Sequence, residues 1–308
     1  MTKSLPPGFK HVGTAYAEAI DYMQKRRTGE IKSVATPWSR FDNSLMGGFE
    51  WNTINVIAAR PAAGKTLMAS IITRRSFELN PTEDIAVLDF QFEMLSRNSA
   101  MREFSSVLER SMKELNSVGK KLSDADMDAA RKYIASIPKD RPIYTVERPQ
   151  SVDNLKKAVD IFATCYPDKK LLITLDHTML VKKSSDEKDM METLYRLGDA
   201  LTSMKREYNC LFIILSQLNR DIESTERIRP GTIGNYPLSK DVFQSDSILQ
   251  HTDNLIALNR PAKYNIDKYG PNGYLITDKN IIAAHLLKAR NGVEGMLWFY
   301  AEFEKMRF

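Results

Sequence analysis

Eight residues, 59–66, have the types and the spacing of a loop that holds a nucleotide phosphate. They read Ala-Arg-Pro-Ala-Ala-Gly-Lys-Thr and lie between an apolar run at 54–58 and a helical pattern that begins at Leu67. In a strand–loop–helix of this kind, the loop amides and the positive end of the helix surround the β- and γ-phosphates. Lys65 would add a point charge and the Thr66 hydroxyl would ligate Mg²⁺.

The usual form of this loop, G-x-x-x-x-G-K-[ST], has a glycine where this chain has Ala59. The alternative interpretation is a helix cap that happens to carry a lysine, because Gly-Lys-Thr triplets are common. The position of the triplet between a buried strand and an amphipathic helix favours the phosphate loop. We therefore predict that ATP and Mg²⁺ bind here. The expected nucleotide contacts are Arg60, Pro61, Ala62, Ala63, Gly64, Lys65, Thr66 and Leu67.

Three other apolar runs each end in a polar residue with a possible role beside a bound nucleotide. These residues are Glu93, Asp176 and Gln217, and ligands of open α/β sheets bind at the carboxyl ends of the strands. Asp176 suits Mg²⁺ coordination, with Thr66 as its partner. Glu93 suits a general base that polarises the attacking water, and Gln217 suits a sensor of the γ-phosphate. Each residue is alternatively a simple cap or turn residue, an interpretation that their co-occurrence disfavours.

The elements that must hold these groups alternate between strands and helices. Residues 95–137 look like a lobe of two or three helices, and Ser151 is placed to cap the next helix. This alternation predicts an α/β fold with a mainly parallel sheet that helices cover on both faces. Strands are expected at 53–58, 85–92, 142–146, 171–175 and 211–215.

The last third of the chain has a different pattern. Residues 218–247 contain Pro, Gly, Ser, Asn and many charges without periodicity, which is typical of a long loop that is functional or disordered. Short strands are expected at 254–258, 281–287 and 296–301, and Arg290-Asn291-Gly292 has the signature of a tight turn between the last two. The chain should therefore end in a β-hairpin.

The N-terminal region is expected to lie outside the main domain. Apolar residues recur at helical spacing over 12–27, and residues 28–42 look like a linker. This pattern predicts a linker helix with its connector over 1–42 and an ATPase domain over 43–308. The helix could fold back on its own core, but the length of the linker favours docking on a neighbouring subunit.

Bulk properties exclude some classes of protein. The 308 residues are 43% hydrophobic and 27% charged, and no stretch reaches the roughly 20 apolar residues that a membrane span needs. Cys165 and Cys210 lie in apolar surroundings without metal-ligand spacing, which predicts reduced core residues in a cytoplasmic protein. A net charge of +5 and a pI near 9.0 permit a polyanionic partner without establishing one.

Five features together resemble the DnaB family of replicative DNA helicases. They occur in that family's order: the loop at 59–66, Phe-Glu-Met at 92–94, Asp176, Ile-Leu-Ser-Gln-Leu-Asn-Arg at 214–220, and Lys-Ala-Arg-Asn-Gly at 288–292. The Arg-Pro in the first feature and the Lys-x-Arg-Asn-Gly in the last are the most specific. The resemblance covers nearly the whole chain and implies a RecA-like P-loop NTPase fold.

The resemblance also implies a mode of action. The family's motor is a hexameric ring that holds ATP between subunits, and there Lys288 and Arg290 would reach the γ-phosphate of the neighbouring subunit. The helix at 12–27 would be the linker helix that packs on that neighbour. Movement along single-stranded DNA from 5′ to 3′, and a helicase loader as partner, are further implications. A bacterial cell is the implied setting, and the short architecture is compatible with a phage or plasmid gene.

Two departures from the family pattern bear on partners. Some eleven residues precede the expected linker helix, so the family's N-terminal domain, which contacts primase, is expected to be missing. The segment 241–250 resembles the family's DNA-gripping loop, but Phe243 and Asp246 replace the usual arginine and glycine. For Phe243 we favour packing on its own domain over stacking on a base. The expected DNA contacts are Lys182, Lys183, Lys240, Phe243, Gln244 and Ser245.

Three functions are compatible with these features. We favour an ATP-driven ring that moves on single-stranded DNA and separates the duplex. A RecA-like recombinase or branch-migration ATPase would share the phosphate loop, the glutamate and the glutamine, but the Lys-x-Arg-Asn-Gly hairpin and the linker helix disfavour it. An ATP-dependent oligomeric regulator without unwinding activity is disfavoured because Glu93, Asp176, Gln217 and Arg290 are all present.

Overall fold

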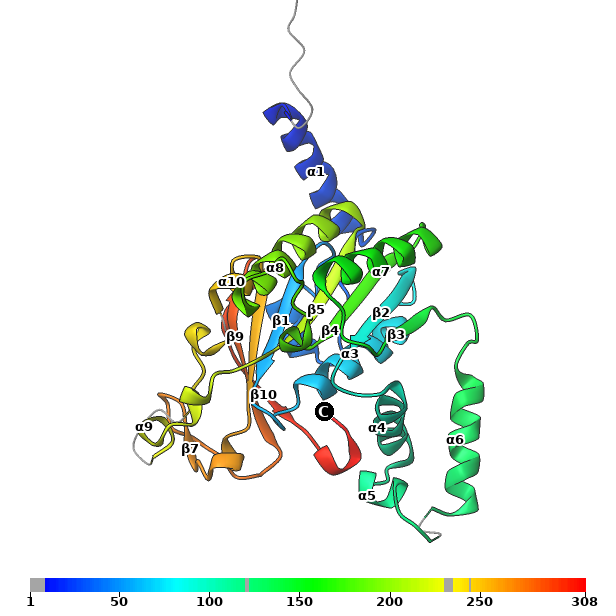
Figure 1. Cartoon of the computed structure of the whole chain (residues 1–308), viewed down its shortest axis with the longest axis vertical. Coiled ribbons are helices and arrows are strands. Elements are labelled where there is room, and N and C mark those ends of the chain that lie inside the picture. Colours follow the sequence, from blue (N-terminus) through cyan, green and yellow to red (C-terminus); the bar gives the residue numbers. More distant parts are fainter. Residues whose placement is uncertain (1–8, 120–121, 230–234, 244) are drawn as a thin grey trace, which may run out of the picture.

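An eight-stranded sheet forms the centre of the structure (Figure 1). The computed structural model describes residues 9–119, 122–229, 235–243 and 245–308. The strands of this sheet are β1 (Ile54–Ala59), β2 (Ile85–Gln91), β3 (Ile143–Val146), β4 (Lys170–Asp176), β5 (Cys210–Gln217), β6 (Asn254–Asn259), β9 (Ile281–Ala289) and β10 (Gly295–Tyr300). A separate two-stranded ribbon consists of β7 (Lys268–Tyr269) and β8 (Tyr274–Leu275).

Most of the sheet is parallel. The strand order is β10-β9-β6-β1-β5-β4-β2-β3, and the antiparallel pairs are β6 with β9 and β9 with β10. The register places Gln217 opposite Ala59 and Asp176 opposite Gln91. The prediction of a mainly parallel sheet that ends in a β-hairpin is confirmed, and β7 and β8 were not expected.

Helices surround this sheet and extend beyond it (Figure 1). The α-helices are α1 (Val12–Thr28), α2 (Ser39–Ser44), α3 (Lys65–Leu79), α4 (Ser96–Leu108), α5 (Met112–Leu115), α6 (Asp124–Ser136), α7 (Val152–Cys165), α8 (Met190–Glu207), α9 (Thr225–Ile228) and α10 (Ser245–Leu249). Short 3-10 helices are η1 (Thr178–Leu180), η2 (Arg220–Glu223), η3 (Ser239–Asp241), η4 (Pro261–Tyr264) and η5 (Phe303–Lys305).

The two faces of the sheet carry different helices. On one face, α7 and α8 bury apolar residues such as Leu155 and Leu197 against the strands, and on the other face α2 and α3 bury Phe41 and Met68. Every residue of β1 is buried. The strands therefore read as continuous apolar runs, because neither face meets water.

The N-terminal segment divides into two parts with different packing. Val34 and Phe41 are fully buried in the same cluster as β1 and α3, so residues 33–42 belong to the core and are not a free connector. None of the described residues of α1 is buried. This helix projects away from the sheet (Figure 1) and exposes an apolar face that includes Tyr16 and Ile20.

Three further observations concern the sequence predictions. The described part of 218–247 is not structureless, because it contains η2, α9, η3 and the start of α10. Cys210 is buried as expected, but Cys165 is exposed near the end of α7, so its prediction as a core residue was wrong. Within the part of the chain that the structure describes, no helix has the length and apolarity to cross a membrane.

Candidate active site

The loop between β1 and α3 has the backbone of a phosphate-binding turn. Gly64 caps α3 with φ at 99°, and Ala62 also has a positive φ of 64°. Glycine at 64 avoids the steric cost of that conformation, and a Cβ there would lie 2.8 Å from the ring of Phe308. The amides of the following turn point out of the N-terminus of α3, where an anion is stabilised.

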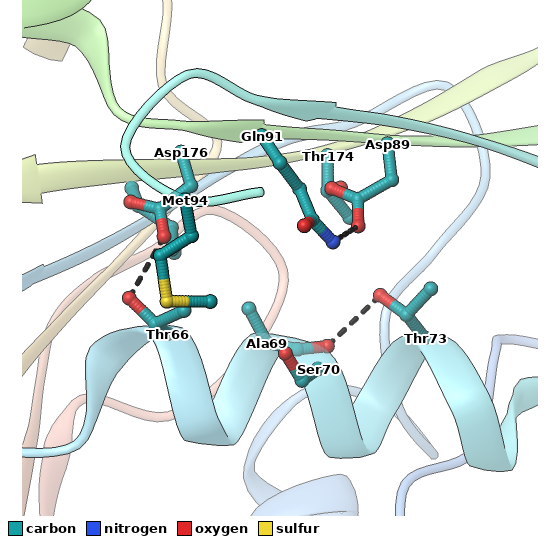
Figure 2. A pocket seen from close by; sticks show the side chains of 10 residues that line it. Thr66, Ala69, Ser70, Thr73, Asp89, Gln91, Met94, Thr174 and Asp176 are labelled. Carbon is teal, nitrogen blue, oxygen red and sulfur yellow. Dashed lines mark hydrogen bonds between the residues drawn. The ribbon is translucent and has the colours of Figure 1, made fainter. Parts of the chain in front are cut away.

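Lys65 and Thr66 reach from this loop to the end of β4. The Lys65 ammonium lies 3.1 Å from Asp176 Oδ1 and 3.5 Å from Glu93 Oε2. The Thr66 hydroxyl donates a 2.8 Å hydrogen bond to Asp176 Oδ2, as Figure 2 shows. Lys65 and Asp176 are buried, whereas Glu93 is half exposed. One buried cation thus bridges the two carboxylates that the sequence placed at strand ends.

A small cavity lies behind the Thr66–Asp176 pair, between α3 and the sheet (Figure 2). Its volume of about 20 Å³ is enough for a water-sized group and too small for a nucleotide. Asp89 lines it and accepts hydrogen bonds from Thr174 and Gln91. Burial raises the pKa of Asp89, which favours its neutral form and makes it a weaker cation ligand than Asp176.

The residues that face the phosphate loop fit a magnesium–nucleotide. Among the described residues, no cluster of three or more His, Cys, Asp or Glu side chains could form a closed metal site. Mg²⁺ at nucleotide sites uses one or two protein oxygens and completes its shell with phosphates and water. The adjacent oxygens of Thr66 and Asp176 match that donor set.

Gln217 and His177 lie next to each other at this edge of the sheet. His177 Nε2 is 3.4 Å from the Gln217 amide nitrogen and 3.8 Å from Glu93 Oε2. Burial and the nearby charge of Lys65 lower the pKa of His177. The edge therefore gathers Lys65, Thr66 and the three strand-end residues predicted from the sequence, together with a histidine that was not predicted.

Arg60 connects the phosphate loop to the chain after β5. Its guanidinium forms an ion pair with Glu223, with the Nε and Oε1 atoms 2.9 Å apart, and donates a hydrogen bond to the Leu218 carbonyl. Lys263 donates to the carbonyl of Pro61. The Arg60 side chain is thus part of the framework of the loop, and whether it also contacts nucleotide stays a prediction.

The structure does not bring Lys288 and Arg290 to this site. Both lie at the end of β9, which runs antiparallel to β6, whereas β1 and β6 are parallel. The end of β9 is therefore at the opposite edge of the sheet from the phosphate loop. The two edges are separated by the length of β1, roughly 20 Å for six residues.

A buried carboxylate holds Arg290 at that far edge. Asp253 is almost fully buried and lies 2.7 Å from both the Arg290 guanidinium and the Lys205 ammonium. It also accepts a hydrogen bond from the amide of Ile54. Lys288 donates to the Leu249 carbonyl, and burial with the nearby Arg290 lowers its pKa. The side chain of Arg290 remains more than half exposed, so it is accessible to another molecule.

The described residues among the predicted DNA contacts differ in exposure. Lys182, Lys183 and Lys240 are exposed, while Phe243 is half-buried. The amide of Phe243 donates to the backbone carbonyl of Gln217, so the segment is joined directly to the edge of the sheet that carries the phosphate loop. Gln244 and the side chain of Ser245 lie outside the described residues. These contacts stay predictions.

The sequence did not predict three polar residues that lie at or near the two edges of the sheet, the one with the phosphate loop and the one with Arg290. They are His177, Asp89 and Asp253, and only His177 had a local signal, since it directly follows the strand-end carboxylate Asp176. Asp89 lies within an apolar run and Asp253 just before one. Each has a partner that is distant in sequence, Thr174 for Asp89 and Arg290 for Asp253.

Three features define a RecA-like P-loop NTPase. They are the phosphate loop after β1, the carboxylate of Asp176 at the end of β4, which lies two strands from β1, and the mainly parallel sheet. Solved structures with the same fold include an ATPase domain that matches with a TM-score of 0.78 and 19% identity over 94% of this chain and 96% of that chain. A DnaB-like replicative helicase, determined with its interactions with primase, matches with a TM-score of 0.76 and 20% identity over 94% of this chain and 64% of that chain.

The chain belongs to the family described as DnaB-like helicase C terminal domain, whose model matches residues 20–308. The replicative DNA helicase DnaB of Geobacillus stearothermophilus is 27% identical over 96% of this chain, and so is the replicative DNA helicase DnaC of Bacillus subtilis. This chain spans 62% of the length of each of these relatives. The resemblance predicted from the sequence is confirmed.

Proposed function

We propose that the chain binds ATP·Mg²⁺ in the loop at 59–66 and hydrolyses it to ADP and phosphate. Lys65 and the loop amides would hold the β- and γ-phosphates, and Thr66 and Asp176 would hold the metal, which neutralises charge as the phosphoryl group is transferred. The Lys65 ammonium lies 3.1 Å from Asp176. This contact supports the assignment, because phosphate oxygens can replace the carboxylate as the partner of Lys65.

Glu93 and Gln217 would act on the terminal phosphate in different ways. Glu93 is the general base that orients the attacking water, and its half-exposed side chain is free to turn toward it. Gln217 is the sensor of the γ-phosphate. The backbone carbonyl of Gln217 accepts a hydrogen bond from the amide of Phe243. A change at Gln217 would therefore act directly on the segment that resembles the family's DNA-gripping loop.

The wider proposal is an ATP-driven helicase ring that moves on single-stranded DNA. Arg290, with Lys288, would complete the ATP site of the adjacent subunit and stabilise the charge of the transition state. The apolar face of α1 would pack on the neighbour. A hexamer, 5′ to 3′ movement, a helicase loader and DNA contacts through residues such as Lys182 and Phe243 are parts of this proposal.

The observation that carries the proposal is the division of the chemical groups between two edges of one sheet. Lys65, Asp176 and Glu93 converge at the carboxyl edge, and Arg290 is exposed at the other. A single chain cannot bring Arg290 to its own phosphate loop without unfolding its sheet. Two chains arranged head to tail can do so, which is the geometry of a ring or a filament.

Strand separation tests the proposal. A forked DNA with two single-stranded tails is incubated with ATP and Mg²⁺ and either the parent chain or Glu93→Gln. We expect the parent to unwind the fork and the variant to fail, because the amide cannot act as a base, while nucleotide binding persists.

The other outcomes are equally informative. DNA-stimulated hydrolysis without unwinding would favour the recombinase alternative, and binding of ATP without hydrolysis would favour the regulator. Normal unwinding by Glu93→Gln would remove Glu93 from the hydrolytic step.

A further inference from the structure

His177 is the residue that contacts both of the side chains proposed to act on the terminal phosphate. Its ring lies between β2 and β5, with Nε2 3.4 Å from the amide of Gln217 and 3.8 Å from the carboxylate of Glu93. The side chain is almost fully buried. A buried polar ring at such a position needs a partner for each of its nitrogens.

The backbone determines which ring nitrogen carries the proton. The amide of Met179 donates to His177 Nδ1 over 3.3 Å at the start of η1. A nitrogen that accepts a hydrogen bond has no proton, so in the neutral ring the proton lies on Nε2. Nε2–H is therefore a donor, and it faces Glu93 and Gln217. The Gln217 amide can rotate to present its oxygen to it.

Two groups, the Lys65 ammonium and His177 Nε2, compete for the Glu93 carboxylate. The Lys65 ammonium is 3.5 Å from Glu93 Oε2 and His177 Nε2 is 3.8 Å from the same oxygen. Once phosphate oxygens bind Lys65, that lysine no longer restrains the carboxylate. His177 then becomes the donor that holds Glu93, and the half-exposed side chain needs only a small rotation to form a hydrogen bond.

We propose that His177 is a positioning residue for hydrolysis, whose Nε2–H fixes the Glu93 carboxylate beside Gln217 while nucleotide is bound. This inference rests on the proposed hydrolytic function and deepens it. The histidine does not take part in proton transfer. It holds the base in the orientation that its water needs, and a misplacement of about 1 Å at such a site lowers the rate by up to roughly 100-fold.

The test compares three substitutions of His177 that differ in where they place a donor. A glutamine side chain carries its terminal N–H at nearly the reach of Nε2, an asparagine carries it at the reach of Nδ1, and phenylalanine keeps the ring without a donor. The parent, His177→Gln, His177→Asn and His177→Phe are assayed for kcat and KM of ATP hydrolysis and for binding of a fluorescent ATP analogue.

We expect His177→Phe to lower kcat by roughly 10- to 100-fold with little change in nucleotide binding. His177→Gln should restore most of the parent kcat, and His177→Asn should not. A merely structural role for the buried ring predicts the opposite order, since phenylalanine fills the space best. Equal kcat for the parent and His177→Phe, or better activity of His177→Asn than of His177→Gln, would overturn the proposal.

A double-mutant cycle links the effect to Glu93. If His177 acts through Glu93, His177→Phe should cost little of the residual ATP hydrolysis of Glu93→Gln, because coupled residues are not additive. Full additivity of the two losses would contradict the proposal. His285→Phe is the matched control. His285 is also a buried histidine, bonded to Tyr269 rather than to the site, so its loss tests the general effect of removing such a ring.

The same assays separate this inference from the function on which it rests. Parent hydrolysis that Glu93→Gln strongly reduces establishes the hydrolytic site on its own. If, in addition, the single variant His177→Phe had the kcat of the parent, only the positioning role would be rejected. Absence of hydrolysis by the parent would reject the proposed function, and the positioning role with it.

Discussion

Two carboxylates near the phosphate loop, Asp176 and Asp89, differ in their surroundings. Asp176 accepts hydrogen bonds from the Lys65 ammonium and the Thr66 hydroxyl. Asp89 lies nearby but bonds only to neutral groups, Thr174 and Gln91, and burial raises its pKa. The first is suited to hold a cation and the second is suited to join β2 to β4.

This difference predicts how the two carboxylates respond to the loss of charge. Asp176→Asn should raise the Mg²⁺ concentration for half-maximal ATP hydrolysis by roughly 10- to 100-fold, since it removes charge at the metal. Asp89→Asn should change it little, because asparagine resembles the neutral acid. A magnesium titration of hydrolysis measures both. A similar increase for the two variants would show that Asp176 has no special role in holding the metal.

Residues at the strand ends were predictable because they follow long apolar runs. Asp176 and Gln217 stand where a continuous run stops, and parallel strands bring such ends to one edge of the sheet. His177 and Asp253 lie beside Glu93 and Arg290, respectively. Those pairs form across the sheet from residues far apart in the chain, so spacing along the sequence carries no sign of them.

The helices and strands show the same contrast between features that the local sequence predicts and features that depend on tertiary contacts. Periodicity predicted the main helices and strands to within a few residues, because each has one clear pattern. It predicted a linker over 28–42, where the local sequence has turn residues. Val34 and Phe41 nevertheless pack against Phe49 and the sheet. Their burial comes from tertiary contacts that no local pattern reveals.

The packing of this segment can be tested by its effect on stability. Phe41→Ala should lower the free energy of unfolding by about 3–5 kcal/mol, because it leaves a cavity in a filled cluster. Phe9→Ala is the matched control, since Phe9 is 67% exposed and a surface change of this kind usually alters stability by less than about 0.5 kcal/mol. Denaturant unfolding of the two variants measures the difference. Equal midpoints would mean that residues 33–42 are a detachable connector.

Across the whole molecule, two surfaces of the described residues are accessible to another molecule. One is the exposed Arg290 at the far edge of the sheet, where it forms an ion pair with Asp253. The other is the apolar face of α1, which projects from the domain (Figure 1). Both surfaces are available for the proposed assembly, in which each chain completes the ATP site of the next.

Mixing of inactive variants tests that arrangement directly. Lys65→Ala removes the phosphate ligand but keeps the far edge, and Arg290→Ala keeps the loop but removes the proposed finger. Each alone should lose hydrolysis. In a head-to-tail ring assembled from an equal mixture, about one interface in four pairs an intact loop with an intact Arg290, so part of the activity should return.

The control for this experiment is a mixture of Lys65→Ala with Glu93→Gln. Both substitutions damage the same edge of the sheet, since Lys65 and Glu93 lie 3.5 Å apart in one chain. No interface in that mixture has an intact loop edge, so no activity should return at any ratio. Recovery with Arg290→Ala but not with Glu93→Gln would identify Arg290 as the group supplied by the neighbour. Failure of both mixtures at every ratio, with assembly verified by light scattering, would count against an ATP site shared between subunits.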